Sequence, residues 1–114
     1  MTGYAHHGFA VHYDVTNQIH IEGTIHAVRY RNPHAEISVR VQDENGEETI
    51  WSCETQASSI LARKGITKDR FPIGEPIAIT GAKARRHPTR CEISSARLPD
   101  GETVTMRSEQ GHAN

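Results

Sequence analysis

The chain has 114 residues, which is the length of one small domain with a single hydrophobic core. Thirteen basic residues nearly balance fourteen acidic ones, so the net charge does not favour nucleic acid or an anionic membrane as a partner. The mean hydropathy is −0.63, and no apolar run approaches the ~20 residues that a membrane-spanning helix needs.

Residues 1–17 are predicted to form a polar arm that is rich in histidine. Gly3 and Ala5 have the spacing of small residues that suits cleavage by a signal peptidase after Ala5. Such cleavage would make His6 the first residue of an exported protein. The alternative is a cytosolic chain that starts at Met1, and the residues alone slightly favour this alternative.

The central feature of the chain is a predicted pair of strands, residues 18–30 and 34–41, joined by a turn at Asn32-Pro33. Both segments alternate apolar and polar residues with a period of two, which is typical of half-buried strands. Gly23 is the predicted bend point of the first strand, which must bend to pair on both sides of a barrel. The residues expected to face the core are Ile19, Ile21, Ile25, Ala27, Ala35, Ile37, Val39 and Val41.

Further strands and one helix are predicted downstream. Asn45-Gly46 indicates a hairpin turn, and Phe71 is expected to fill the core. Residues 108–114 are predicted to be disordered. The predicted elements are a strand at 48–54, a helix from Ser58 or Ser59 (its cap) to Gly65, strands at 77–81 and 91–98, and a short strand at 103–106.

This order of elements predicts the fold. Three strands, a helix and two more strands follow one another in the five-stranded OB barrel. We therefore predict an all-β fold with one short helix, a five-stranded OB-like β-barrel over residues 18–107. A small open sandwich is the main alternative.

The two cysteines, Cys53 and Cys91, lie in different predicted strands and lack the spacing of a zinc or redox motif. A disulfide in an oxidising compartment and two free buried thiols are both compatible with this placement. Catalysis by either thiol is not favoured, because no local base accompanies them apart from His87 near Cys91. Glu54 and Glu92 are not expected to form a carboxylate pair.

Four histidines are candidate metal ligands, namely His6, His7, His12 and His34. Neutral imidazole is the commonest protein ligand for copper, zinc and nickel. Ligands usually come from separate segments, so an arm folded back along the barrel would bring His6 or His7 to His34. After cleavage, the amine and ring of His6 with a second histidine would form a T-shaped three-nitrogen copper site. The alternative is a solvated polar arm that binds no metal.

The basic loop between the last two main strands is a second candidate site. Arg85 and Arg86, together with Trp51 at the barrel mouth, are candidate contacts for a small anion, an oligomer or a partner protein. OB barrels that bind oligonucleotides need several stacking aromatics, and the second and third strands offer only Trp51. Nucleic acid is therefore not an expected partner.

Two short motifs carry a resemblance to a known family. They are Ala5-His6-His7-Gly8-Phe9 and Asn32-Pro33-His34, and the order of the other motifs extends the match over nearly the whole chain. The chain resembles a family of small exported bacterial proteins classed as a domain of unknown function, in which Ser is usual at the place of Gly8. The resemblance implies export to the periplasm and an OB-like barrel, with no settled activity.

The sequence therefore predicts a periplasmic protein that binds copper, or alternatively zinc. The predicted ligands are His6, His7 and His34, with His12 as an auxiliary ligand. One alternative is an OB module without metal that binds a small molecule or a protein. Another is a copper-dependent enzyme or enzyme subunit.

Overall fold

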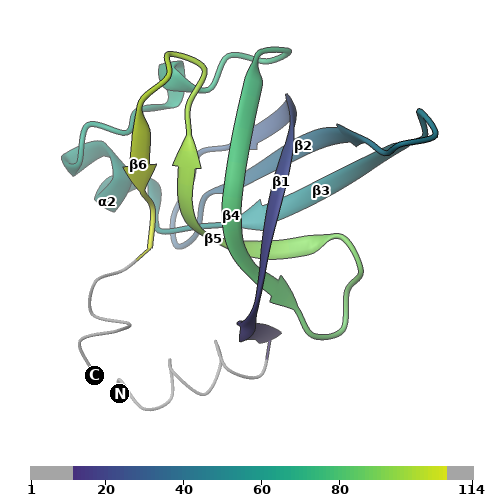
Figure 1. Cartoon of the computed structure of the whole chain (residues 1–114). Coiled ribbons are helices and arrows are strands. Elements are labelled where there is room, and N and C mark those ends of the chain that lie inside the picture. Colours follow the sequence, from purple (N-terminus) through teal and green to yellow (C-terminus); the bar gives the residue numbers. More distant parts are fainter. Residues whose placement is uncertain (1–11, 108–114) are drawn as a thin grey trace.

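The computed structural model describes residues 12–107 (Figure 1). The predicted tail at 108–114 and the arm up to residue 11 lie outside the described residues. The strands are β1 (Tyr13–Arg29), β2 (Glu36–Gln42), β3 (Glu48–Glu54), β4 (Pro76–Ala84), β5 (Arg90–Arg97) and β6 (Thr103–Thr105). The helices are α2 (Ser58–Arg63) and the 3-10 helix η1 (Lys68–Arg70).

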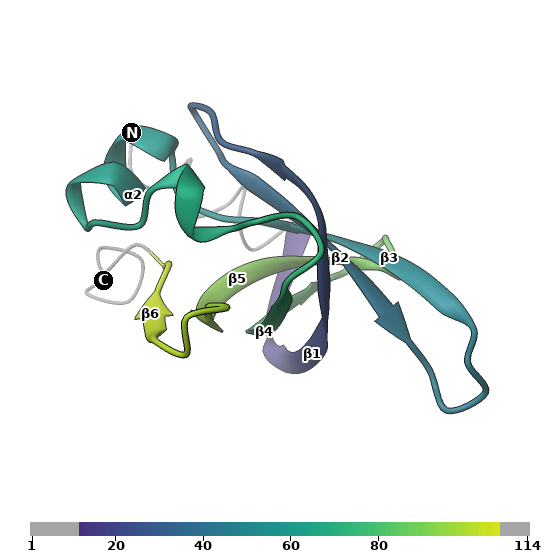
Figure 2. The ribbon, with the colours of Figure 1, turned by 90° about the horizontal axis from the view of Figure 1, so that it is seen from above.

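Five of the strands close into a ring. The sheet order is β3-β2-β1-β4-β5-β6, and an additional pairing of β3 with β5 completes the circle. The β3–β5 pairing is parallel, and the other pairings are antiparallel. Figure 2 shows the β2–β3 hairpin projecting from the ring on the side opposite α2. The ring and the helix between β3 and β4 confirm the all-β, OB-like prediction over the open sandwich.

Strand β1 begins earlier than predicted. It starts at Tyr13 rather than Gln18, because β4 continues to Ala84 and pairs Tyr13 with Ala84 and Asp14 with Lys83. The predicted end of β4 at residue 81 was therefore also too early. The register shifts between Asp14 and Gln18, an irregularity that hides this part of the strand from a period-two pattern.

Strand β1 passes from one partner strand to the other beside Gly23. Thr24 is opposite Pro76 on β4 and also opposite Arg40 on β2. A Cβ atom at Gly23 would lie 2.1 Å from the carbonyl oxygen of Arg40, so no larger residue fits at this crossing without a shift of the backbone. The predicted bend point is thus a place of close backbone approach.

A second irregularity in β1 changes which residues face the core. The register with β2 shifts between Ile25 and Ala27, which leaves an extra residue, His26, on β1. Beyond this bulge Val28 and Tyr30 pack against the core. The prediction that Ala27 belongs to the core was therefore wrong, because one inserted residue reverses the side on which later residues lie.

The core fills the ring and continues under α2. Its predicted members Ile21, Ile25 and Phe71 are buried. The most deeply buried large side chains are Ile25, Ile37, Leu61, Ile79, Ile93, Met106 and Val39. No helix within residues 12–107 has both the length and the apolar character that crossing a membrane requires.

The two cysteines lie in this core and form a disulfide. Cys53 and Cys91 are opposite residues of the parallel β3–β5 pair, with a Cα–Cα distance of 4.5 Å and no exposed surface. The sequence allowed either a disulfide or two free thiols, and the structure shows the disulfide. The bond crosslinks the two strands whose pairing closes the ring.

The β1–β2 turn caps the helix α2. The Asn32 side-chain oxygen accepts hydrogen bonds from the Ser59 backbone N–H and the Ser58 hydroxyl, each at 3.1 Å. The N-cap residue is Ala57, and no side-chain cap comes from Ser58 or Ser59 as predicted. The acceptor for the first turn is supplied from a distant part of the chain instead. The predicted helix end at Gly65 is confirmed by its φ of 79°.

Candidate functional site

The described histidines fall into two groups. His20 contacts Thr80 and Glu22 through its two ring nitrogens, His26 contacts Arg40, and the His87 ring accepts a bond from the backbone of Thr89. The rings of His12 and His34, by contrast, make no hydrogen bond within residues 12–107, and both residues are exposed. The two predicted ligands in the described part of the chain are thus the two histidines with uncommitted rings.

The backbone around His34 is held in place. His34 follows the cis peptide bond between Asn32 and Pro33. The next residue, Ala35, is buried, and it exchanges backbone hydrogen bonds with Gln56 and Thr55 at 3.0 and 2.9 Å. Because side chains alternate along an extended chain, the inward position of Ala35 directs His34 outward. An exposed ring is thus attached to a well-anchored turn.

Three glutamates form a row on the outer face of the ring beyond this turn. Glu36 on β2 is opposite Glu54 on β3, and Glu54 is opposite Glu92 on β5. Glu54 and Glu92 are thus neighbours across the parallel β3–β5 pair, an arrangement that was not predicted from the sequence. A sequence signal for the pair does exist, since Cys53-Glu54 and Cys91-Glu92 repeat one dipeptide. Once the cysteines are opposite each other in parallel strands, the following glutamates must be opposite too.

The start of β1 packs onto this row of glutamates. The Tyr13 hydroxyl donates a hydrogen bond of 2.6 Å to Glu54, and the Arg90 guanidinium lies 2.9 Å from Glu36. Burial and the neighbouring Glu54 raise the pKa of Tyr13 far above its ordinary value, so the phenol stays protonated. The Tyr13–Glu54 hydrogen bond therefore holds the first residue of β1 against this row, while the Arg90–Glu36 ion pair joins β5 to β2 beside it.

Glu92 is the most perturbed carboxyl group of the row. Burial raises its pKa to about 7, with Arg107 opposing the shift and Glu54 adding to it. One carboxyl oxygen of Glu92 is buried and has no hydrogen-bond partner within the described chain. An ionised carboxylate is costly in such a place, which explains why Glu92 retains its proton up to near-neutral pH.

The described residues do not by themselves assemble a metal centre. In the part of the chain that the structure covers, no three His, Cys, Asp or Glu residues are grouped so that they could hold an ion. His6 and His7 lie outside the described residues. The ligand set of His6, His7, His12 and His34 stays a prediction.

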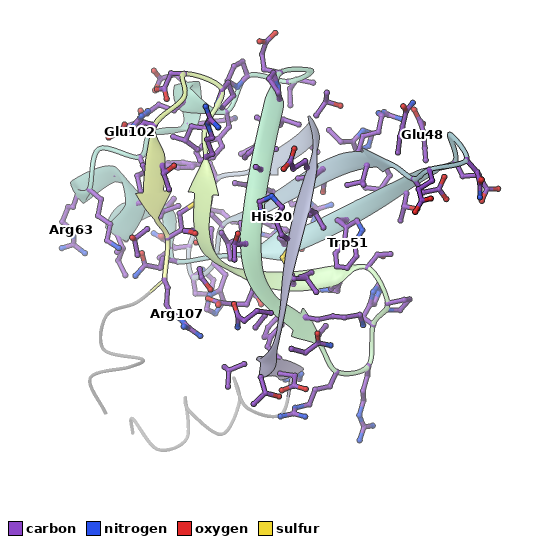
Figure 3. All side chains as sticks on the ribbon, in the orientation of Figure 1. His20, Glu48, Trp51, Arg63, Glu102 and Arg107 are labelled. Carbon is purple, nitrogen blue, oxygen red and sulfur yellow. A yellow bond between two sulfur atoms is a disulfide. The ribbon has the colours of Figure 1, made fainter. Side chains whose placement is uncertain are left out.

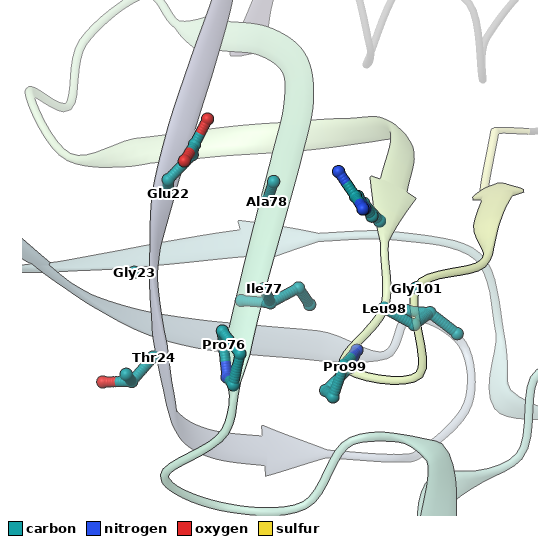
Figure 4. Close-up of a pocket in the computed structure, with 10 residues that line it drawn as sticks. Glu22, Gly23, Thr24, Pro76, Ile77, Ala78, Leu98, Pro99 and Gly101 are labelled. Carbon is teal, nitrogen blue, oxygen red and sulfur yellow. The ribbon is translucent and has the colours of Figure 1, made fainter.

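None of the three predicted ligand contacts at the barrel mouth lines the pocket that lies on the outer face of β1, β4 and β5. Trp51 lies between the β2–β3 hairpin and the β4–β5 loop, partly buried against the core (Figure 3). Arg85 lies 3.9 Å from Asp14, and Arg86 is exposed. The roles of these three residues stay predictions. A pocket of about 540 Å³ lies elsewhere, on the outer face of β1, β4 and β5 (Figure 4).

Comparison with known proteins gives one family match. A family described as "Family of unknown function (DUF6152)" matches residues 1–92. The matched region includes all four candidate histidines and ends at Glu92. No curated protein matches the chain.

Proposed function

The chain belongs to the DUF6152 family, whose function is unknown, and we propose that it is an exported protein that binds a transition metal. Copper is the first choice and zinc the second. The ligands are His6, His7 and His34, with His12 as an auxiliary ligand. The observation that carries the proposal is that the rings of His12 and His34 have no hydrogen-bond partner among residues 12–107, while the other described histidines are hydrogen-bonded.

The place where the arm joins the barrel supports this ligand set. Tyr13 is bonded to Glu54, which is opposite Glu36, and Glu36 lies two residues beyond His34 on the same outer face. An extended chain covers at most about 3.3–3.6 Å per residue, so the six residues from His7 to Tyr13 span up to roughly 20 Å. The arm therefore starts close enough to His34 for its histidines to reach the turn.

The chemistry of the surroundings also suits an imidazole site. Metal-bound histidines commonly give their second ring N–H to a carboxylate, which fixes the tautomer and raises the basicity of the ligand. Glu36 and Glu54 supply carboxylates on the outer face that His34 shares. Copper(II) and zinc both accept neutral imidazole, and binding then weakens in acid as the rings become protonated.

The disulfide supports export. Disulfides persist in oxidising compartments such as the bacterial periplasm and are rare in the cytosol. The Cys53–Cys91 bond is buried at the closing seam of the ring, where it belongs to the fold. Removal of a signal peptide after Ala5 would expose the His6 amine as a further nitrogen ligand.

A metal titration tests the proposal. Copper(II) and zinc(II) are titrated into metal-free protein in two forms, the full chain and a chain that begins at His6. We expect each form to bind one equivalent of copper, and the form with the free His6 amine to bind it more tightly. A calorimetric titration that shows no specific binding to either form would contradict the proposal.

A further inference from the structure

The outer face of β1, β4 and β5 carries a trough with charged walls. Glu22 on β1 is opposite Ala78 on β4, and Ala78 is opposite Arg97 on β5. All three line the pocket of about 540 Å³. A small side chain between two long ones leaves a hollow over the middle strand. The hollow therefore has a carboxylate on one side and a guanidinium on the other.

The acidic wall is held in position by its neighbours. A carboxylate oxygen of Glu22 lies 2.9 Å from Nε2 of His20, and the other ring nitrogen of His20 lies 3.0 Å from the Thr80 hydroxyl. Thr80 is two residues from Ala78 on β4, so the network runs alongside the trough. A group that is already positioned loses less conformational freedom when a ligand binds.

The basic wall of the trough, Arg97, has no acidic partner among residues 12–107. Four arginines, Arg40, Arg70, Arg85 and Arg90, lie within 4 Å of a carboxylate, whereas Arg97 belongs with the exposed arginines that do not. Arg97 is exposed and forms no ion pair with any of residues 12–107. A guanidinium binds carboxylates through two parallel N–H donors, so this side of the trough favours an anionic group.

We propose that the trough binds a small zwitterion of the amino-acid class. Its ammonium group lies at Glu22 and its carboxylate at Arg97. Neighbouring strands are about 4.8 Å apart, so the Cα atoms of these residues are separated by about 10 Å across β4. The side chains of Glu22 and Arg97 are both long enough to extend toward Ala78, and in the proposed complex they do so and shorten that gap to the span of a small ligand. Pro76 and Pro99 line the same end of the trough, as Figure 4 shows, and limit its length.

The binding test uses glycine as the probe and follows backbone amide shifts by NMR in the full chain. Glycine is expected to cause saturable shifts at Gly23, Ala78 and Gly101, which line the pocket. Acetate and methylammonium each carry only one of the two charges and serve as half-ligands. We expect each of them to bind roughly tenfold more weakly or worse, because one charge-assisted contact is lost.

Two variants test the assigned contacts. Both Glu22→Gln and Arg97→Gln should weaken glycine binding by roughly tenfold, since each removes one charged partner. Both residues are exposed, so the remaining amide signals should keep their positions. Arg63→Gln, which changes an exposed arginine at the end of α2, should bind glycine as the native protein does.

Three results would overturn the proposal. One is the absence of saturable shifts at Gly23, Ala78 and Gly101 at glycine concentrations that fill a millimolar site. Another is unchanged glycine affinity in Arg97→Gln. The third is equal binding of acetate and glycine, which would make the trough an anion site.

Discussion

One carboxyl oxygen of Glu92 is shielded from water and from every hydrogen-bond donor within residues 12–107. The folded protein raises the pKa of this group from 4.5 to about 7. Between these two values the folded state holds a proton that the unfolded state has released. The free energy of unfolding contributed by Glu92 therefore falls as the pH rises through this window, and the loss is complete above it.

Glu92→Gln should remove this pH dependence, because glutamine does not titrate. Relative to the native protein, the variant should gain stability on going from about pH 5 to about pH 8, by on the order of 3 kcal/mol. Urea unfolding at both pH values measures the difference. Glu44→Gln, at an exposed carboxylate of the β2–β3 loop, is the control. A stability difference that is equal at the two pH values would contradict this account of Glu92.

Two single-residue features show what could be predicted from the sequence and what could not. The outward position of His34 follows from the alternation around Ala35, and the structure agrees. The pairing of Glu54 with Glu92 was missed, because it requires knowing that β3 and β5 are neighbours although 38 residues separate Cys53 from Cys91. Alternation along the sequence predicts which face of the sheet a side chain lies on, but it does not predict which strands are neighbours in the sheet.

At the scale of elements, Tyr13 attaches the first residues of β1 to β3. Tyr13→Phe removes the hydroxyl that donates to Glu54 at 2.6 Å. A hydrogen bond to a charged group typically contributes about 1.5–3 kcal/mol, so the variant should lose about that much stability. Urea unfolding tests the loss, with Tyr30→Phe as the matched control for a hydroxyl that donates to the Ile66 carbonyl at 2.8 Å. If Tyr13→Phe loses no more stability than Tyr30→Phe, the Glu54 carboxylate does not make the Tyr13 hydrogen bond stronger than one to a neutral carbonyl.

The parallel β3–β5 pairing is a short seam that the disulfide crosslinks. Its register covers residues 52–54 of β3 and 90–92 of β5. For a sequence separation of 38 residues, the chain-entropy relation gives a stabilisation of about 4 kcal/mol.

Reduction of the Cys53–Cys91 bond should therefore lower the urea midpoint strongly. The double variant Cys53→Ala/Cys91→Ala should be less stable than the oxidised protein and insensitive to the reductant. Equal midpoints for the oxidised and the fully reduced native protein would show that the disulfide does not contribute to closing the ring.

The elements that followed a regular period were predicted well, and the irregular ones were not. Strands β2 and β3 were predicted close to their observed bounds from alternation and from the Asn45-Gly46 turn. The early start of β1 and the bulge at His26 were missed, because each inserts residues that break the period. The helix cap was assigned to serine side chains, whereas Asn32 supplies it from a distant turn.

At the scale of the whole molecule, the ring offers two outer surfaces with different chemistry. One combines the row of glutamates, the start of β1 and the ring of His34, which has no hydrogen-bond partner within the described residues. The other is the trough between Glu22 and Arg97 on β1, β4 and β5. The proposed metal site therefore depends on the arm together with the barrel, while the zwitterion site depends on the barrel alone.

The most direct test of the central claim compares the copper affinity of His34→Ala with that of His20→Ala. His20 is the matched control, because its ring is already occupied by Thr80 and Glu22. A competition titration of the full chain should show at least a roughly tenfold loss of affinity for His34→Ala, as expected for a missing metal-ligand contact. His20→Ala should bind copper as the native protein does. Equal copper affinity for the native protein and both variants would contradict a metal site that includes His34.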